Sequence, residues 1–294
     1  MLPSLTIQHL DYLVAVTEFP TWAAAAADRG VSPSALSQGL AELERRLGIP
    51  LFERDGRRRV PSRHTGEVVA YARRVLADTR DLGRWLDDLE TGTAGELRLG
   101  MIDAALGHWP DVLPRIRAEH PDVDLHLTIG PSATLLDQVA ANELDLAVVV
   151  APRELSASFE WVPLMDDPLA VYAPADTTVG PPPTWGPWVT FPPTSHTRRL
   201  IDRALAHRGA PTTVTSESNQ PEVLKEMVHL GLGWTVLPIV QAETGPQPLQ
   251  RATPEPLLTR SLLAARRSTR YRHPLTDSLI DWLTTGVSDR GDAE

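Results

Sequence analysis

Short hydroxyl and amide side chains at the start of one predicted helix carry the most informative chemistry in this sequence. Ser34, Ser37 and Gln38 follow Ser32 and Pro33, which are the residue types of a helix N-cap and first turn. Such side chains can hydrogen-bond to base edges in the major groove of DNA and to the flanking phosphates. The sequence therefore predicts a DNA-reading surface at the start of this helix.

A cluster of arginines follows the same helix. It holds one acidic residue, Asp55, and five basic ones: Arg54, Arg57, Arg58, Arg59 and Arg63. A compact positive loop of this kind suits contact with the phosphate backbone. A charge run that is merely solvated is the alternative interpretation.

Two short helices and a turn must position these residues. Residues 23–28 form an alanine-rich helical run, Arg29 and Gly30 break it, and Gly48 ends the second helix. In that helix the apolar side chains recur at spacings of four, three and four: Leu36, Leu40, Leu43 and Leu47. This spacing turns one apolar stripe inward and leaves the serines and Gln38 outward. A preceding helix over residues 7–17 is expected to be scaffold.

Composition indicates a globular protein of about two domains. The chain has 294 residues, of which 42% are hydrophobic. No segment approaches the roughly 20 apolar residues of a membrane span, and the N-terminus lacks the pattern of a signal peptide, so we expect a cytoplasmic protein without a membrane partner. The absence of cysteine excludes disulfide switching, thiolate catalysis and zinc-thiolate sites.

The net charge of −10 is distributed unevenly along the chain. Residues 1–90 hold 12 arginines and 13 acidic residues, a net charge of −1, whereas residues 91–294 hold 16 basic and 25 acidic residues, a net charge of −9. The acidity therefore belongs to the second part of the chain. It does not argue against DNA binding by the first part.

A long helix over residues 67–90 separates the two parts. Apolar or small side chains recur at alternating spacings of four and three along it: Val68, Ala72, Val75, Thr79, Leu82, Leu86 and Leu89. A heptad seam of this length predicts dimerisation by paired helices. Packing of the helix on its own domain is the alternative.

Strands alternate with helices after a small, polar break at residues 91–95, which predicts a mostly parallel α/β sheet. Residues 96–101, 124–129 and 144–150 have strand patterns, with helices between them. The proline-rich segment 181–188 is unsuited to regular structure. We expect its Trp185 and Trp188 to pack on the surface, or alternatively to narrow the mouth of a cleft.

Four blocks in the first part resemble the winged helix-turn-helix of LysR-type transcriptional regulators. They are LDYLVAVTEFPTWAAAA, VSPSALS, LAELERRLG and PLFER, in order and at the family's spacing, and the arginine loop stands where the family has its wing. Further on, ELRLG, LPRIRAEHPDVDLHL, LLDQVAANELDLAVVV and MVHLGLGWTVLP resemble the family's effector-binding domain. The chain departs from the family at Gln38 and Glu42, where arginine or lysine is frequent.

The resemblance implies an α/β protein with three parts. These are a winged helix-turn-helix at residues 1–65, a dimerising linker helix at 66–91, and an effector-binding domain at 92–294 that is similar to periplasmic solute-binding proteins. The last would have two lobes, lobe I at 95–160 and 268–294 and lobe II at 161–267. The implied partners are double-stranded DNA with an inverted repeat, a small-molecule effector, RNA polymerase, and a second copy of the chain in a homodimer or homotetramer.

An effector is expected between the lobes, beyond the carboxyl ends of strands where helices begin. The candidate residues there are Asp103, Ser132, Ser195, Thr197, Arg198, Asn219 and Gln220. Each taken alone is also a plausible helix cap or turn residue. Asp103 would disfavour an anionic effector and favour one with an amine, unless it only caps its helix, and Arg198 could pair with an effector carboxylate.

No catalytic or metal-binding constellation is present in the sequence. Ser195 and His196 are adjacent, whereas a nucleophile and its base must face each other across space. The histidines show no metal-ligand spacing, and no phosphate-binding glycine loop occurs. We expect a transcriptional regulator without a cofactor. The alternatives are an effector-independent DNA-binding protein and an α/β enzyme fused to a DNA-binding segment.

Overall fold

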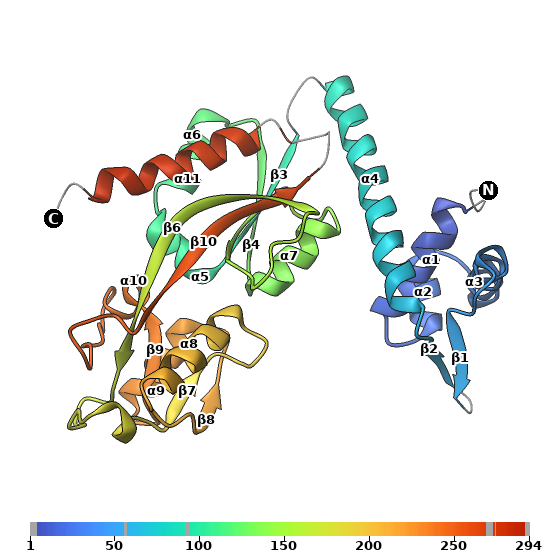
Figure 1. Cartoon of the computed structure of the whole chain (residues 1–294). Helices are drawn as coiled ribbons and strands as arrows, with labels where there is room; N and C mark the ends of the chain where they lie inside the picture. The colour runs from blue at the N-terminus through green and yellow to red at the C-terminus, as the bar shows by residue number, and fades with distance from the viewer. Residues whose placement is uncertain (1–4, 56–57, 92–94, 269–272, 274, 292–294) are drawn as a thin grey trace. The chain divides into compact units, whose positions relative to one another are not determined.

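The computed structural model describes residues 5–55, 58–91, 95–268, 273 and 275–291. The chain divides into two compact units (Figure 1). The first comprises Met1–Asp87 with Ala140–Asn142, and the second comprises Asp88–Val139 with Glu143–Glu294.

The first unit contains three short helices, a β-hairpin and one long helix. Its elements are α1 (Ile7–Glu18), α2 (Trp22–Asp28), α3 (Pro33–Leu47), β1 (Phe52–Asp55), β2 (Arg58–Pro61) and α4 (Thr65–Thr91). Thr6, Thr21 and Ser32 each accept a backbone hydrogen bond at the start of α1, α2 and α3. α3 ends at Gly48, whose φ of 70° is the left-handed conformation that glycine tolerates. The predicted helix-turn-helix is confirmed.

α3 packs on α1 through leucines and through one glycine. Leu36, Leu40 and Leu43 are fully buried in the core of this unit. A Cβ atom at Gly39 would lie 2.7 Å from Cδ2 of Tyr12 on α1. Glycine inside a helix costs about 1 kcal/mol relative to alanine, and here that cost is offset by the close approach of the two helices.

β1 and β2 form an antiparallel hairpin, the wing, which is tied to the end of α3. Arg54 on β1 lies opposite Arg59 on β2. Oε1 of Glu44 accepts hydrogen bonds from the backbone N–H groups of Leu51, at 2.7 Å, and Phe52, at 2.9 Å. These bonds fix where the wing begins relative to α3.

α4 packs on its own unit along its first half. Of the predicted seam positions one is fully buried, two are partly buried and three are exposed: Ala72, then Val68 and Val75, then Thr79, Leu82 and Leu86. The exposed fractions of Leu82 and Leu86 are 55% and 48%. The side chain of Leu89 lies outside the described residues. The first half of the seam therefore contributes to the subunit's own core, while two large apolar side chains in the second half face solvent.

A six-stranded mixed sheet organises the second unit, in the order β4-β3-β5-β10-β6-β9. Its strands are β3 (Glu96–Met101), β4 (Asp124–Ile129), β5 (Leu146–Val150), β6 (Phe159–Tyr172), β9 (Thr235–Pro238) and β10 (Leu258–Arg267). β3 is parallel to β4 and β5, whereas β10 is antiparallel to β5 and β6, and β9 is antiparallel to β6. The expectation of a mostly parallel sheet was wrong beyond β5, because two long strands cross back through the unit.

Two hydrophobic cores divide the second unit into two lobes. Lobe I is built around β3, β4 and β5 with α5 (Asp103–His108), α6 (Val112–Glu119), α7 (Ser132–Ala140) and α11 (Leu275–Gly291). Lobe II is built around β9 and the parallel pair β7 (Trp188–Thr190) and β8 (Val214–Glu217), with η1 (Pro182–Thr184), α8 (His196–His207), α9 (Pro221–His229) and α10 (Ile239–Ala242). The strands β6 and β10 run through both lobes (Figure 1).

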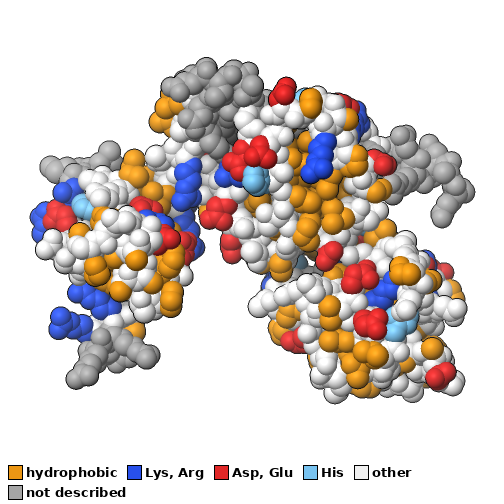
Figure 2. All heavy atoms as spheres, turned by 180° about the vertical axis from the view of Figure 1, so that it is seen from behind, with side chains coloured by type: hydrophobic (Ala, Val, Ile, Leu, Met, Phe, Trp, Pro, Cys, Tyr) orange, Lys and Arg blue, Asp and Glu red, His pale blue; other side chains and the backbone are white. Residues whose placement is uncertain are grey.

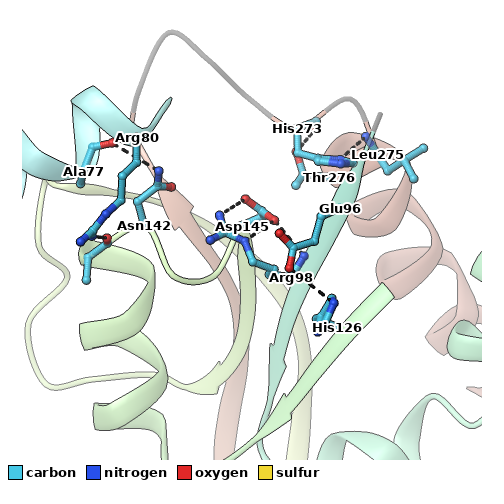
Figure 3. A network of polar contacts seen from close by, with 11 residues as sticks. Ala77, Arg80, Glu96, Arg98, His126, Asn142, Asp145, His273, Leu275 and Thr276 are labelled. Carbon is cyan, nitrogen blue, oxygen red and sulfur yellow. Dashed lines mark hydrogen bonds and ion pairs between the residues drawn. The ribbon is translucent and has the colours of Figure 1, made fainter. Parts of the chain in front are cut away.

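Asp145 fixes the register of β5 against β3 (Figure 3). Its carboxylate accepts hydrogen bonds from the backbone N–H of Arg98, at 2.8 Å, and from the guanidinium of Arg98, at 3.1 Å. The backbone N–H of Asp145 donates to the carbonyl of Arg98 at 2.8 Å. On the neighbouring strand, His126 lies 3.5 Å from Glu96 at the same end of the sheet.

The two tryptophans of the segment 181–188 belong to the core of lobe II, while residues 181, 183, 184 and 187 are exposed. Trp185 and Trp188 are buried, and the ring of Trp185 stacks on Trp234 with 6.0 Å between the centroids. Their indole N–H groups donate to the carbonyls of Gly180, at 2.9 Å, and Pro211, at 2.6 Å. The expected positions of both rings, on the surface or at a cleft mouth, were wrong, because both indoles are packed in the core of lobe II.

The contact between Gly39 and Tyr12 predicts opposite outcomes for two glycine substitutions. Gly39→Ala should destabilise the protein by about 1–2 kcal/mol, because overpacking outweighs the gain in helix propensity. Gly66→Ala, at an exposed position of α4 where an added Cβ has open space, should be neutral or slightly stabilising. Urea denaturation of both variants checks this, and a stabilising Gly39→Ala would show that the helices tolerate a wider separation.

Candidate nucleic-acid interface and ligand-binding region

The start of α3 presents its polar side chains to solvent. Ser32 caps the helix, with Oγ accepting from the N–H of Ala35 at 3.1 Å, and its Oγ lies 2.9 Å from Oγ of Ser34. Ser34 and Gln38 are exposed, as are Ser32 and Pro33, whereas Ser37 is half-buried. Burial of the leucine stripe holds this polar face outward. The face is therefore accessible in the subunit, as a DNA-reading surface must be.

The second half of α3 neutralises much of its own charge. Glu42 accepts hydrogen bonds from Nε of Arg45, at 2.7 Å, and from Nε of Arg46, at 2.6 Å. The hydrogen bonds from Arg45 and then Arg46 lower the pKa of Glu42 to about 2, so this carboxylate is ionised at neutral pH. Arg45 and Arg46 are therefore both engaged with a carboxylate of their own helix.

The wing carries arginines in two different settings. Arg54 is exposed, while the guanidinium of Arg59, also exposed, lies over the ring of Trp22 at 4.6 Å from its centroid. Trp22 in turn packs edge-on against Phe52, with ring centroids 5.1 Å apart. Arg59 is thereby held close to the first residue of α2 by a cation–π contact.

Three further arginines belong to the predicted cluster: Arg57, Arg58 and Arg63. Arg63 is exposed and its Nε donates to Nε2 of His64 at 3.0 Å. Arg57 and the side chain of Arg58 lie outside the described residues. Figure 2 shows Lys and Arg side chains on several parts of the first unit, including its lower end, and acidic side chains spread over the second unit.

In the second unit, the carboxyl end of β5 contacts one predicted ligand-binding residue, Ser132, and one residue outside the predicted set, His196. Oγ of Ser132 accepts a hydrogen bond from the N–H of Val150 at 3.0 Å, and the carbonyl of Val150 lies 3.4 Å from Nδ1 of His196. Ser132 comes from lobe I and His196 from the first turn of α8 in lobe II. The backbone of Val150 therefore brings the starts of two helices, one from each lobe, to one place.

Asp103 is the first residue of α5 and is separated from β3 by Ile102. α5 begins without a side-chain cap hydrogen bond. The carboxylate is half-buried, and this burial raises its pKa above the ordinary value. A half-buried carboxylate at this end of the sheet can accept hydrogen bonds from an amine or a hydroxyl.

The predicted residues of α8 are held by neighbouring side chains. Ser195 caps α8, with Oγ accepting from the N–H of Arg198 at 3.4 Å. Oγ1 of Thr197 is buried and accepts from Nη1 of Arg260 at 2.7 Å. The guanidinium of Arg198 donates to three acceptors at 2.7–3.0 Å, which are the carbonyl of Phe191 and the carboxylates of Asp202 and Glu217. Arg198 thus has a structural role in lobe II.

Asn219 and Gln220 lie in a different turn of lobe II, between β8 and α9. Both are exposed, directly before α9. The side chain that orders this turn is Ser218, whose Oγ accepts from the N–H of Gln220 at 3.1 Å.

Sequence analysis missed four polar residues that connect the two lobes: His108, Asp167, His196 and Arg260. Oδ1 of Asp167 lies 2.9 Å from Nε2 of His108, and Oδ2 accepts from Nε of Arg260 at 2.9 Å. Burial raises the pKa of Asp167, but the hydrogen bond from His108 and the charge of Arg260 outweigh burial and hold it below the ordinary value. Partners 59 and 93 residues apart leave no local pattern by which one sequence could identify them.

The described residues contain neither a candidate metal site nor a candidate membrane span. Within this part of the chain, no group of three or more His, Asp or Glu side chains is arranged to hold a metal ion. Among the helices of the same residues, none is both long and apolar enough to cross a bilayer.

Comparison with known proteins gives matches over nearly the whole chain. Residues 7–65 match the family model described as a bacterial regulatory helix-turn-helix protein of the lysR family, and residues 90–288 match the LysR substrate binding domain. The transcriptional activator IlvY of Salmonella typhimurium is 31% identical over 229 residues, which are 75% of this chain and 78% of IlvY.

Two solved structures have a similar fold. A full-length OxyR variant from Pseudomonas aeruginosa has a TM-score of 0.63 at 23% identity, covering 96% of this chain and 94% of its own. Full-length CbnR in complex with its target DNA has a TM-score of 0.62 at 16% identity, covering 96% of this chain and all of its own.

Proposed function

This chain belongs to the LysR family of bacterial transcriptional regulators, and we propose that it binds an inverted-repeat operator as a homodimer and responds to an amine-bearing effector held between the lobes of its second unit. DNA binding and an effector-binding domain come with the family, and its named relatives are regulators rather than enzymes. The operator geometry, the assembly, the effector and the residue roles are what we propose.

The open polar face of α3 is the observation that supports operator recognition most directly. In the proposed complex Ser34, Ser37 and Gln38 contact bases or adjacent phosphates, with Ser32 and Pro33 at the entry of the helix. Arg54, Arg59 and Arg63 bind the backbone together with Arg57 and Arg58. Of these, Gln38 is exposed and lies on the same face as Ser34, one turn further along α3. It is therefore the residue that we assign to base recognition.

Homodimerisation through α4 is supported by the exposed Leu82 and Leu86. Exposure of these large apolar side chains to water is unfavourable. They also continue the heptad seam beyond the part of α4 that packs in its own core. A twofold dimer presents two copies of α3 to half-sites about one helical turn apart. We further propose that dimers pair into tetramers through the second unit, where the edge strand β4 exposes Leu127 and Ile129.

The effector site that we propose lies where α5, α7 and α8 begin. Asp103, Ser132, Ser195 and Thr197 supply its polar groups, and Asn219 and Gln220 would join them only if the lobes close. The guanidinium of Arg198 is engaged within lobe II, so we assign it to positioning α8. The protein would act in the cytoplasm, where its DNA is, with RNA polymerase as its downstream partner and without a cofactor.

Two substitutions separate base recognition from phosphate binding. Gln38→Ala should lower affinity for the operator by about 1–3 kcal/mol with little effect on random DNA. Arg54→Ala should weaken binding to both and reduce the salt slope by about 1. Fluorescence anisotropy with both DNAs at several salt concentrations measures this, on an operator located by footprinting upstream of the protein's own gene. The surface variant Arg115→Ala on α6 is the matched control, and equal losses on both DNAs for Gln38→Ala would contradict the assignment.

Charge placed on the exposed part of the seam should dissociate the dimer. The double variant Leu82→Glu/Leu86→Glu is expected to sediment as a monomer and to lose most operator affinity, because each half-site then binds alone. Ala70→Glu, also exposed on α4 but off the seam, should remain a dimer. Sedimentation equilibrium tests both variants, and a dimeric double variant would place the interface elsewhere.

An effector that carries an amine should stabilise the native chain and require Asp103. A thermal-shift screen of amino acids, amines, aromatic acids and central metabolites should give at least one amine that raises Tm, since binding at about 100 times Kd adds about 2.7 kcal/mol. Asp103→Asn should abolish that shift and leave the unliganded Tm near the native value. If no compound shifts Tm, the effector-independent alternative is favoured, and if only anions do, the role of Asp103 is wrong.

A further inference from the structure

A buried ion pair lies on the two strands that join the lobes. Asp167 on β6 and Arg260 on β10 are directly opposite each other in the antiparallel register. Nε and Nη2 of Arg260 both reach Oδ2 of Asp167, at 2.9 and 2.8 Å. Asp167 is fully buried and Arg260 is 5% exposed, so each charge depends on the other for stabilisation.

Hydrogen bonds connect this ion pair to one helix in each lobe. Towards lobe I, Oδ1 of Asp167 lies 2.9 Å from Nε2 of His108, the last residue of α5. Towards lobe II, Nη1 of Arg260 donates to Oγ1 of Thr197 at 2.7 Å, in the first turn of α8. We call these four side chains, His108, Asp167, Arg260 and Thr197, the crossing-strand network.

The network lies at the passage between the lobes. β10 pairs with β5 of lobe I from Leu262 onward, and β6 pairs with β9 of lobe II from Leu169 onward. Asp167 and Arg260 fall between these two pairings. α5 also meets lobe II through Gly107, where an added Cβ would lie 3.2 Å from Cγ2 of Val240 on α10. Movement of α8 relative to α5 must therefore stretch the network.

We propose that the crossing-strand network couples the first turn of α8 to α5, with Asp167 and Arg260 as positioning residues. Because the guanidinium is a rigid fork, Arg260 can bind Asp167 through Nε and Nη2 while it holds Thr197 through Nη1. The hydroxyl oxygen of Thr197 thereby accepts a hydrogen bond from Arg260. A change at Thr197 therefore alters the stability of α5. A change in α5 affects Thr197 by the same coupling free energy, because thermodynamic coupling is reciprocal.

The connection to an effector rests on the function proposed above, since Asp103 is the first residue of α5 and Ser195 caps α8. The coupling between the lobes does not depend on it. An experiment without any ligand therefore tests the network separately from effector binding.

Hydrogen exchange of the full-length protein, followed by mass spectrometry, tests the coupling. Thr197→Val keeps the shape of the side chain and removes its acceptor. It should raise the exchange rate in peptides covering α5, in the other lobe, by about fivefold, a typical size for such coupling. Ser195→Ala is the matched control, because it removes a hydroxyl from the same turn that caps α8 without joining the network. It should affect α8 and leave α5 within twofold.

The Thr197→Val substitution in an Arg260→Lys variant tests whether the coupling depends on Arg260. Arg260→Lys can retain an ion pair with Asp167, but an ammonium group has no fork with which to hold Thr197 as well. In that background Thr197→Val should add no further exchange in α5. Unchanged α5 exchange in Thr197→Val, an equal rise in Ser195→Ala, or an additive effect with Arg260→Lys would each overturn the proposal. None of these outcomes bears on whether a metabolite binds.

Discussion

The buried leucine stripe of α3 is the constraint on which the DNA-reading surface depends. Leu36, Leu40 and Leu43 have no exposed surface, and burial of each contributes about 1.5–3 kcal/mol. Rotation of the helix by a quarter turn would expose leucine and bury serine or glutamine without partners. The orientation of Ser34 and Gln38 toward solvent therefore follows from the core, and Gly39 makes it possible by letting α3 approach Tyr12 closely.

Arginine has two separate uses in this protein. In the second unit Arg198, Arg260 and Arg266 are buried and each is bound to one or two carboxylates. Geometry of this kind needs the several donors of a guanidinium, which a lysine ammonium does not provide. On the wing, by contrast, Arg54 and Arg59 remain exposed and are available to phosphates. A strongly acidic second unit is consequently compatible with DNA binding by the first.

The two strands β6 and β10 join the two lobes of the second unit. They pass through both cores, so the lobes cannot separate without disrupting a continuous antiparallel pairing. Asp167 and Arg260 on these strands are buried and paired, so a movement that separates them would leave two charges without compensation. A ligand alters the balance between two arrangements of the lobes only by binding one of them more tightly.

Local patterns determined the helix-turn-helix, the alternation of strands and helices, and the family, because caps, periodicity and short motifs act over a few residues. Contacts between residues far apart in sequence were decided only by the tertiary structure. The pairing of Asp167 with Arg260, the burial of Trp185 and Trp188, and the fit of Gly39 against Tyr12 each join segments whose proximity no local spacing encodes. A polar residue of this chain can be a helix cap, a buried hydrogen-bond partner or an exposed donor. Its role depends on which residues the tertiary structure places next to it.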